Sequence, residues 1–230
     1  DAEVQVLPFD DLAIDAINQW VNDATRSKIP SVLQPPIPDA AVMYLINAIY
    51  FSAFWEVQFV PEETGISTFY LPSGDAKEVA MMFREGSYPY LRGEGFQAVR
   101  LAYTGDRLSM YVFLPNREST VDAFLKRLTS ENWEHWLGEF HDLGNDSRLY
   151  LPRFQMGLTY IEEMEEALTA LGMGVAFQPG VADFSGIADG LYISRVIHKT
   201  FIEIKEAGTE AAAATVVESS RTSAFPPPPP

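Results

Sequence analysis

Residues able to perform acid–base, nucleophilic or metal chemistry are few in this sequence. The 230 residues include no cysteine and three histidines, His135, His141 and His198. Without cysteine, disulfides, a thiol nucleophile and cysteine-bound metal are excluded. The sequence also contains no Gly-x-Ser-x-Gly, no His-Glu-x-x-His and no phosphate-binding loop. We therefore expect a protein that is not an enzyme and that uses no metal or cofactor.

The charge of the chain disfavours two classes of partner. There are 16 basic and 32 acidic residues, which gives a formal net charge of −16. Such a charge repels phosphate backbones and anionic lipid surfaces, and no apolar run approaches the roughly 20 residues that span a bilayer. We expect neither nucleic acid nor a membrane as partner. The lack of cysteine does not decide the compartment, where we favour a secreted or extracellular protein over a cytoplasmic one.

The first half of the chain alternates between helical and strand patterns. Apolar residues at helical spacing predict an amphipathic helix over residues 11–25. The apolar run 40–51, which contains the polar residue Asn47, predicts a strand covered on both faces. Alternating stretches broken by turn residues then predict antiparallel strands at 67–71, 88–92, 97–102 and 108–114.

The second half returns to helices and ends in a long strand and an unusual tail. Helical periodicity covers 119–128 and 130–140, and Thr159 with Glu162 predicts a capping box for a helix that ends at Gly172. Alternation over 192–205 predicts a long strand. An alanine run and a run of five prolines follow, and we see no repeat and no domain boundary before this tail. Periodicity therefore predicts one mixed α and β domain with large sheets.

Several short motifs follow one another in a distinctive order along the chain. The last motif, Gly208-Thr209-Glu210-Ala211-Ala212-Ala213-Ala214-Thr215, looks like the hinge of an inhibitory serpin. The motifs that precede it, in serpin order, are Ile17-Asn18-Gln19-Trp20-Val21, Asn47-Ala48-Ile49-Tyr50-Phe51 with Trp55 and Phe59, Leu151-Pro152-Arg153-Phe154, Ala182-Asp183-Phe184-Ser185 and His198-Lys199-Thr200-Phe201-Ile202-Glu203.

This resemblance implies a fold and a mechanism. We expect an α+β serpin fold with large, mostly antiparallel β-sheets, in which residues 1–230 form a single domain, 206–225 the hinge and reactive-centre loop, and 226–230 a polyproline segment. The function implied is suicide inhibition of a serine protease, or of a related cysteine protease, which cuts the loop and is trapped as an acyl-enzyme while the loop enters a sheet. We also expect serpin segments before residue 1 and after residue 230, in the same polypeptide or as separate chains.

The residues of the hinge agree with such an insertion. If Thr209 points inward in a strand, then Ala211, Ala213 and Thr215 follow it, while Glu210, Ala212 and Ala214 point outward. Insertion then buries no charge. We expect Gly208 to give the backbone freedom for folding over, and Thr209 to lie largely outside the sheet until the loop is cut. Taken alone, residues 203–214 are equally consistent with a surface helix, because Ala, Glu and Lys favour helices.

The resemblance also assigns a gate and a reactive bond. Asn47 and His198 match a polar pair that controls the opening of the sheet, whereas a lone histidine is usually only a satisfied core residue. Trp55, Arg153 and Glu206 match residues at the entry of the loop, although Trp55 is equally consistent with an ordinary core tryptophan. The usual loop length places the cut bond between Thr222 and Ser223, and a loop one residue shorter places it after Arg221. The alternative functions are a non-inhibitory serpin-fold carrier or chaperone, or an inactive fragment.

Overall fold

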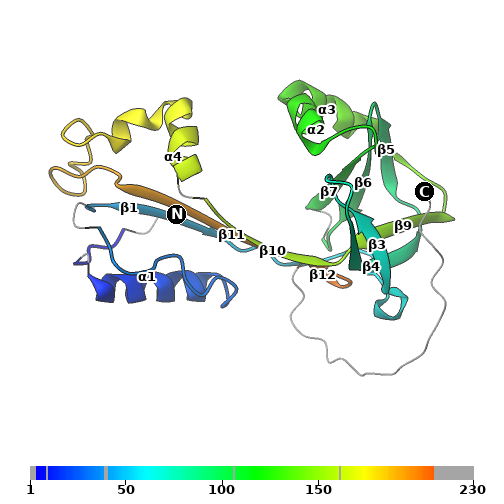
Figure 1. Cartoon of the computed structure of the whole chain (residues 1–230), viewed down its shortest axis with the longest axis horizontal. Coiled ribbons are helices and arrows are strands. Elements are labelled where there is room, and N and C mark those ends of the chain that lie inside the picture. Colours follow the sequence, from blue (N-terminus) through cyan, green and yellow to red (C-terminus); the bar gives the residue numbers. More distant parts are fainter. Residues whose placement is uncertain (1–3, 9, 39–40, 106, 161, 210–230) are drawn as a thin grey trace. The chain divides into compact units, whose positions relative to one another are not determined.

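The chain forms two compact units (Figure 1). The computed structural model describes residues 4–8, 10–38, 41–105, 107–160 and 162–209. The first unit comprises the described residues up to Phe51 and Met156–Ile202, and the second comprises Ser52–Gln155 and the described residues from Glu203 onward. Strands β10 (Phe154–Tyr160) and β11 (Arg195–Lys205) contain residues of both units. The assignment of residues 1–230 to one domain stays a prediction.

In the first unit, helix α1 (Asp11–Ala24) packs its apolar face on a pair of strands (Figure 1). The helix begins where the Asp10 side chain accepts hydrogen bonds from the backbone N–H groups of Leu12 and Ala13, at 3.0 and 3.1 Å. The predicted helix over 11–25 is therefore confirmed. The core beneath it contains Ile14, Leu33 and Ile197, with partly buried Ile17, Val32, Ile37, Tyr44 and Ile46 around them.

Strand β1 (Tyr44–Ile49) pairs in parallel with the first residues of β11. The expectation that this segment is covered on both faces is wrong, because burial alternates along β1 and Leu45 and Ile49 are 43% and 47% exposed. Only the face toward α1 contributes to the core, through Tyr44 and Ile46.

The remaining elements of the first unit lie between β10 and β11 in sequence. They are helix α4 (Glu162–Leu168), the short π-helix η2 (Thr169–Met173) and the short 3-10 helix η3 (Gly174–Phe177). The predicted helix exists, but Thr159 lies within strand β10 and so does not form the expected capping box. Gly172 interrupts the helical backbone with a φ of 99°, close to the predicted end.

The second unit is built on two antiparallel sheets. One has the order β3-β4-β9, and the other has the order β7-β6-β5-β8. Its elements are β2 (Ala53–Phe54), η1 (Pro61–Glu63), β3 (Gly65–Tyr70), β4 (Ala76–Gly86), β5 (Pro89–Gly93), β6 (Phe96–Ala102), β7 (Ser109–Pro115), α2 (Val121–Arg127), α3 (Ser130–Glu139), β8 (His141–Asp142), β9 (Ser147–Pro152) and β12 (Gly208–Thr209). The α+β class with mostly antiparallel sheets is confirmed.

An aromatic core joins the β5–β6–β7 strands to the two helices of this unit. Phe96 contacts Phe124 of α2 and Trp136 of α3, with ring centroids 5.2 and 4.8 Å apart. Thr120 and Thr129 are the N-cap residues of the two helices, and their side chains accept hydrogen bonds from backbone N–H groups of the first turn. Within the part of the chain that the structure describes, no helix has the length and apolar character to cross a membrane.

Candidate functional site

The start of the hinge is already part of a sheet. After β11 the chain turns through Glu206 and Ala207, and Gly208 and Thr209 form strand β12. On one side Thr209 pairs with Ile204 of β11, and on the other side it pairs with Ala53 of β2. Its exposed fraction is 1%. The expectation that Thr209 lies largely outside the sheet before cleavage is therefore wrong, because ladder contacts on both sides hold it in place.

Gly208 is needed for close packing. A Cβ atom at this position would lie 2.7 Å from the Cα atom of Phe54 and closer still to the carbonyl oxygen of Ala53. Carbon atoms in ordinary contact lie about 3.5–4.0 Å apart. The φ of Gly208 lies outside the left-handed region, so the close packing explains a glycine in this conformation. The expected backbone freedom during insertion stays a prediction.

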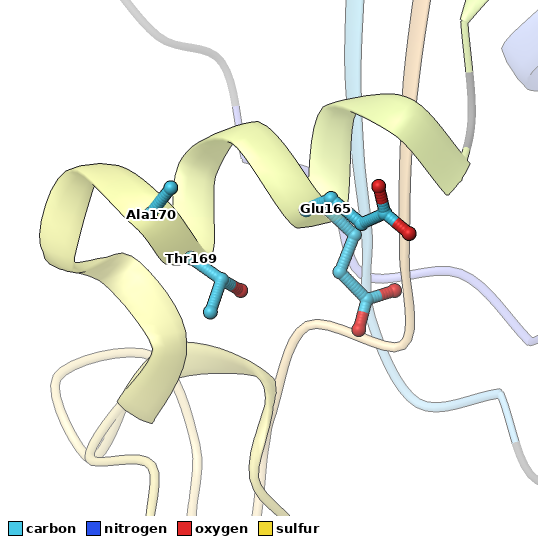
Figure 2. Close-up of a pocket in the computed structure, with 4 residues that line it drawn as sticks. Glu165, Thr169 and Ala170 are labelled. Carbon is cyan, nitrogen blue, oxygen red and sulfur yellow. The ribbon is translucent and has the colours of Figure 1, made fainter.

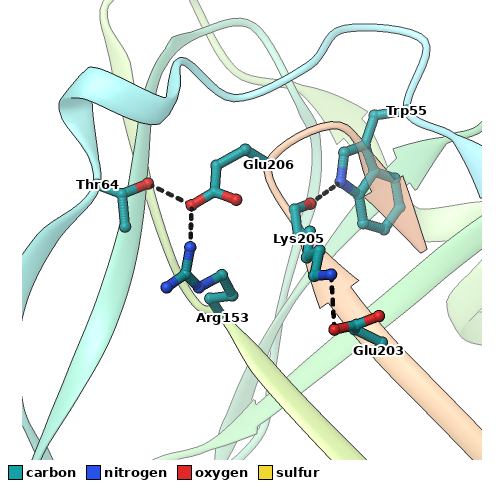
Figure 3. A network of polar contacts seen from close by, with 6 residues as sticks. All are labelled: Trp55, Thr64, Arg153, Glu203, Lys205 and Glu206. Atoms are coloured by element: carbon teal, nitrogen blue, oxygen red, sulfur yellow. Dashed lines mark hydrogen bonds and ion pairs between the residues drawn. The ribbon is translucent and has the colours of Figure 1, made fainter. Parts of the chain in front are cut away.

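Trp55 holds the turn at the start of the hinge, within the second unit. Its side chain is 1% exposed, and its indole Nε1 donates a hydrogen bond to the Lys205 carbonyl at 2.9 Å (Figure 3). Its backbone N–H donates to the Ala207 carbonyl at 3.0 Å. Trp55 is thus both a core tryptophan and a direct partner of the residues where the hinge begins.

Tyr103 is a residue of the site that sequence analysis missed. Its hydroxyl and that of Thr209 share a hydrogen bond of 2.6 Å, and its ring stacks on Trp55 with centroids 4.6 Å apart. Burial raises the pKa of the Tyr103 hydroxyl, and the hydrogen bond with Thr209 offsets part of that rise. The only sequence signal was its position directly after a predicted strand, because the contact with Thr209 joins residues 106 positions apart.

The predicted charged residues at the loop entry lie together. Glu206 Oε1 accepts a hydrogen bond from Thr64 Oγ1 at 2.8 Å and lies 3.4 Å from Arg153 Nη1 (Figure 3). The Glu206 side chain is 11% exposed and that of Arg153 is 49% exposed, so the pair is partly screened by water. A second ion pair joins Lys205 to Glu203, with Nζ and Oε1 2.7 Å apart. Thr64 was not expected from the sequence.

Asn47 and His198 are direct register partners in the parallel pair of β1 and β11. Asn47 is exposed and His198 is half-buried. Their role as a gate stays a prediction.

Several predicted residues lie outside the described part of the chain. They are the remaining hinge residues Glu210, Ala211, Ala212, Ala213, Ala214 and Thr215, the reactive-bond residues Arg221, Thr222 and Ser223, and the polyproline segment 226–230.

An open depression beside helix α4 is formed by residues that are not among the predicted site residues. It is lined by Glu165, Glu166, Thr169 and Ala170 (Figure 2). Nothing in this lining matches the chemistry of the predicted site. Among the described residues there is also no group of three histidine or carboxylate side chains placed to hold a metal ion.

Comparison with known proteins gives one consistent family. The family model "Serpin (serine protease inhibitor)" matches residues 1–229. Human antithrombin-III is 34% identical over 222 residues, which is 93% of this chain and 47% of the relative. Horse leukocyte elastase inhibitor is 36% identical over 225 residues, which is 93% of this chain and 59% of the relative.

Solved structures agree with the sequence comparison. The thermophilic serpin tengpin in its native state matches with a TM-score of 0.78 and 33% identity over 91% of this chain and 54% of that one. Thyroxine-binding globulin in complex with thyroxine matches with a TM-score of 0.79 and 27% identity over 91% and 56%. The chain spans about half the length of the curated relatives it matches. With its motifs in serpin order, a family match over almost every residue and serpin structures as neighbours, the chain belongs to the serpin family.

Proposed function

We propose that this protein inhibits serine-type endopeptidases as a suicide substrate. The observation that carries the proposal is strand β12, in which Gly208 and Thr209 lie between β11 and β2 with Thr209 buried. The names of two relatives, antithrombin-III and leukocyte elastase inhibitor, are consistent with a protease as partner.

The register of β12 predicts where the rest of the loop goes. Thr209 pairs with Ala53 and Ile204, whose numbers differ by 151, and Asn47 and His198 in the β1–β11 pair also differ by 151. The two ladders therefore share one register. Extending β12 along both strands places Thr215 between Asn47 and His198, so insertion replaces the direct pairing of β1 with β11 by pairing on both sides of a new strand.

The side chains of the loop suit such a strand. Thr209 is buried, and its side of the strand is therefore the inward face. The residues that follow on this face are small or medium in size and carry no charge, and the two carboxylates fall on the other face. The inward set is Ala211, Ala213, Thr215 and Val217, and the outward set is Glu210, Ala212, Ala214, Val216 and Glu218.

The protease supplies the chemistry. Its serine hydroxyl oxygen attacks the carbonyl carbon of Thr222 while its general base takes the hydroxyl proton, an ester forms, and the bond to the Ser223 nitrogen breaks as that nitrogen takes up the proton and leaves as an amine. Insertion of the cut loop then competes with hydrolysis of the ester by water. Fast insertion carries the protease away with its active site disturbed, and slow insertion releases it.

The test is the formation of a covalent complex by the full-length protein, including any segments that flank residues 1–230. It is incubated with trypsin-like, elastase-like and subtilisin-like serine proteases, and a complex that survives SDS is expected with at least one of them. If every protease that cuts the loop is released intact, the inhibitory mechanism is refuted, and a carrier function like that of the thyroxine-bound neighbour gains support.

Two neighbouring alanines provide a matched pair of variants. Ala211→Arg places a charge on the inward face, at an effective cost of several kcal/mol, and each 1.4 kcal/mol on the insertion barrier slows insertion about tenfold. Ala212→Arg places the same charge on the opposite face of the strand. We expect Ala211→Arg to be cut as a substrate and Ala212→Arg to keep most of the trapping. Equal loss in both variants would show that the assigned facing is wrong.

A further inference from the structure

The buried residue of the hinge, Thr209, is held by a side chain from another part of the second unit. The Tyr103 hydroxyl lies 2.6 Å from Thr209 Oγ1, and the two residues are 3% and 1% exposed. The position of the Tyr103 hydroxyl is itself constrained, because the ring stacks on Trp55 at 4.6 Å and the Tyr103 backbone N–H donates to the Leu108 carbonyl at 3.0 Å. Tyr103 therefore offers a preorganised partner to one hinge residue.

The backbone of the turn that leads into β12 does not have the conformation of a tight hairpin. The tight two-residue hairpin turns require a positive φ, and neither Glu206 nor Ala207 has one. Strand β12 pairs on both sides, but it has only two residues, Gly208 and Thr209, so few ladder hydrogen bonds hold it. The hydrogen bond to Tyr103 adds a side-chain contact to this short ladder, and it is made by Thr209.

We propose that Tyr103 is a positioning residue that keeps Thr209 in the sheet before the loop is cut, so that insertion starts from a strand end that already exists. The consequence for inhibition rests on the proposed function, whereas the effect on the hinge itself does not. A hydrogen bond between two buried hydroxyls shifts an equilibrium by about tenfold. Loss of the Tyr103 hydroxyl therefore makes departure of Thr209 from the sheet about tenfold more frequent.

The first measurement uses the uncut full-length protein and follows hydrogen exchange of the backbone amides in residues 206–209. Tyr103→Phe keeps the stacked ring and removes the hydroxyl, Thr209→Val removes the other hydroxyl at similar volume, and Thr209→Ser keeps it. We expect exchange about tenfold faster in the first two variants and close to the parent rate in Thr209→Ser. Amides of strands β4 and β9 serve as an internal control and should not change.

The second measurement compares the fraction of a susceptible protease that is trapped with the fraction that is released. Tyr103→Phe and Thr209→Val should both release several times more protease than the parent, and Thr209→Ser should resemble the parent. Trapping that does not change while exchange rises would overturn the proposed link to insertion.

The two proposals fail in distinguishable ways. Parent exchange rates in both Tyr103→Phe and Thr209→Val would overturn the role of Tyr103 even in a protein that traps its target. A parent protein that traps no protease would overturn the proposed function and the link to insertion, while hydrogen exchange would still decide whether Tyr103 holds Thr209.

Discussion

Replacing Gly208 by alanine should damage both the intact fold and the insertion of the loop. The new Cβ atom would lie 2.7 Å from the Phe54 Cα atom and closer still to the Ala53 carbonyl oxygen. Both are backbone atoms, so no side chain can rotate away, and either β2 or β12 must move. Overpacking of this kind costs about 1–3 kcal/mol. We expect a loss of that size in the free energy of unfolding, measured by urea denaturation of the full-length protein.

The same cost affects inhibition if the clash is relieved in the uncut protein by departure of β12 from the sheet, because insertion must then bring the strand back. An insertion barrier raised by about 1–3 kcal/mol slows insertion roughly 5- to 160-fold, so more protease should be released for each molecule trapped. Gly138→Ala is the matched control, because Gly138 lies in helix α3 and its Cβ would meet nothing within 4 Å. It should be neutral or slightly stabilising. Parent-like stability and trapping in Gly208→Ala would refute the close-packing argument.

Three further outcomes are expected. Trp55→Phe removes the donor to the partly buried Lys205 carbonyl and should lower the unfolding free energy in urea by about 1–3 kcal/mol; an unchanged midpoint would contradict this. Because burial raises the folded-state pKa of Tyr103, stability should fall as pH rises above about 10, the value in unfolded chains. Denaturation between about pH 9 and pH 11 should show a smaller fall in Tyr103→Phe than in the parent. If the bond after Thr222 is cut, Thr222→Arg should redirect inhibition toward trypsin-like proteases, and Arg221→Ala should not abolish it; the opposite pattern in inhibition rates would place the bond after Arg221.

The sequence predicted elements best where one local pattern dominates. The helix over 11–25 appears as α1, and alternation over 192–205 appears as β11, because an apolar stripe and an alternating strand are visible within a few residues. Strand β4 (Ala76–Gly86) was missed, since its Met81-Met82-Phe83 run breaks the alternation. Its identity as a strand depends on pairing with β3 and β9 on both sides.

The site was predictable only where family motifs mark it. The resemblance pointed to Trp55, Arg153 and Glu206, which do lie close to the turn before the hinge. It gave no indication that Thr209 is buried or that Tyr103 contacts it, because both facts depend on segments that are distant in sequence and packed together in the fold. Sequence periodicity describes one element at a time, whereas these contacts arise from the packing of several.

Cross-linking tests most directly whether the cut loop enters the sheet between β1 and β11. If the cut loop inserts in the shared register, residue 213 comes to lie opposite Ile49, and directly opposed residues of an antiparallel pair have Cβ atoms close enough for a disulfide. Because residues 1–230 contain no cysteine, Ile49→Cys with Ala213→Cys introduces two thiols into this part of the protein, and any cysteine in flanking segments is replaced by serine. We predict a disulfide within the full-length protein after a verified cut in residues 217–223 and none before it, while Ile49→Cys with the outward-facing Ala212→Cys stays reduced. No disulfide after the cut, or equal disulfide formation in both pairs, would contradict insertion in this register.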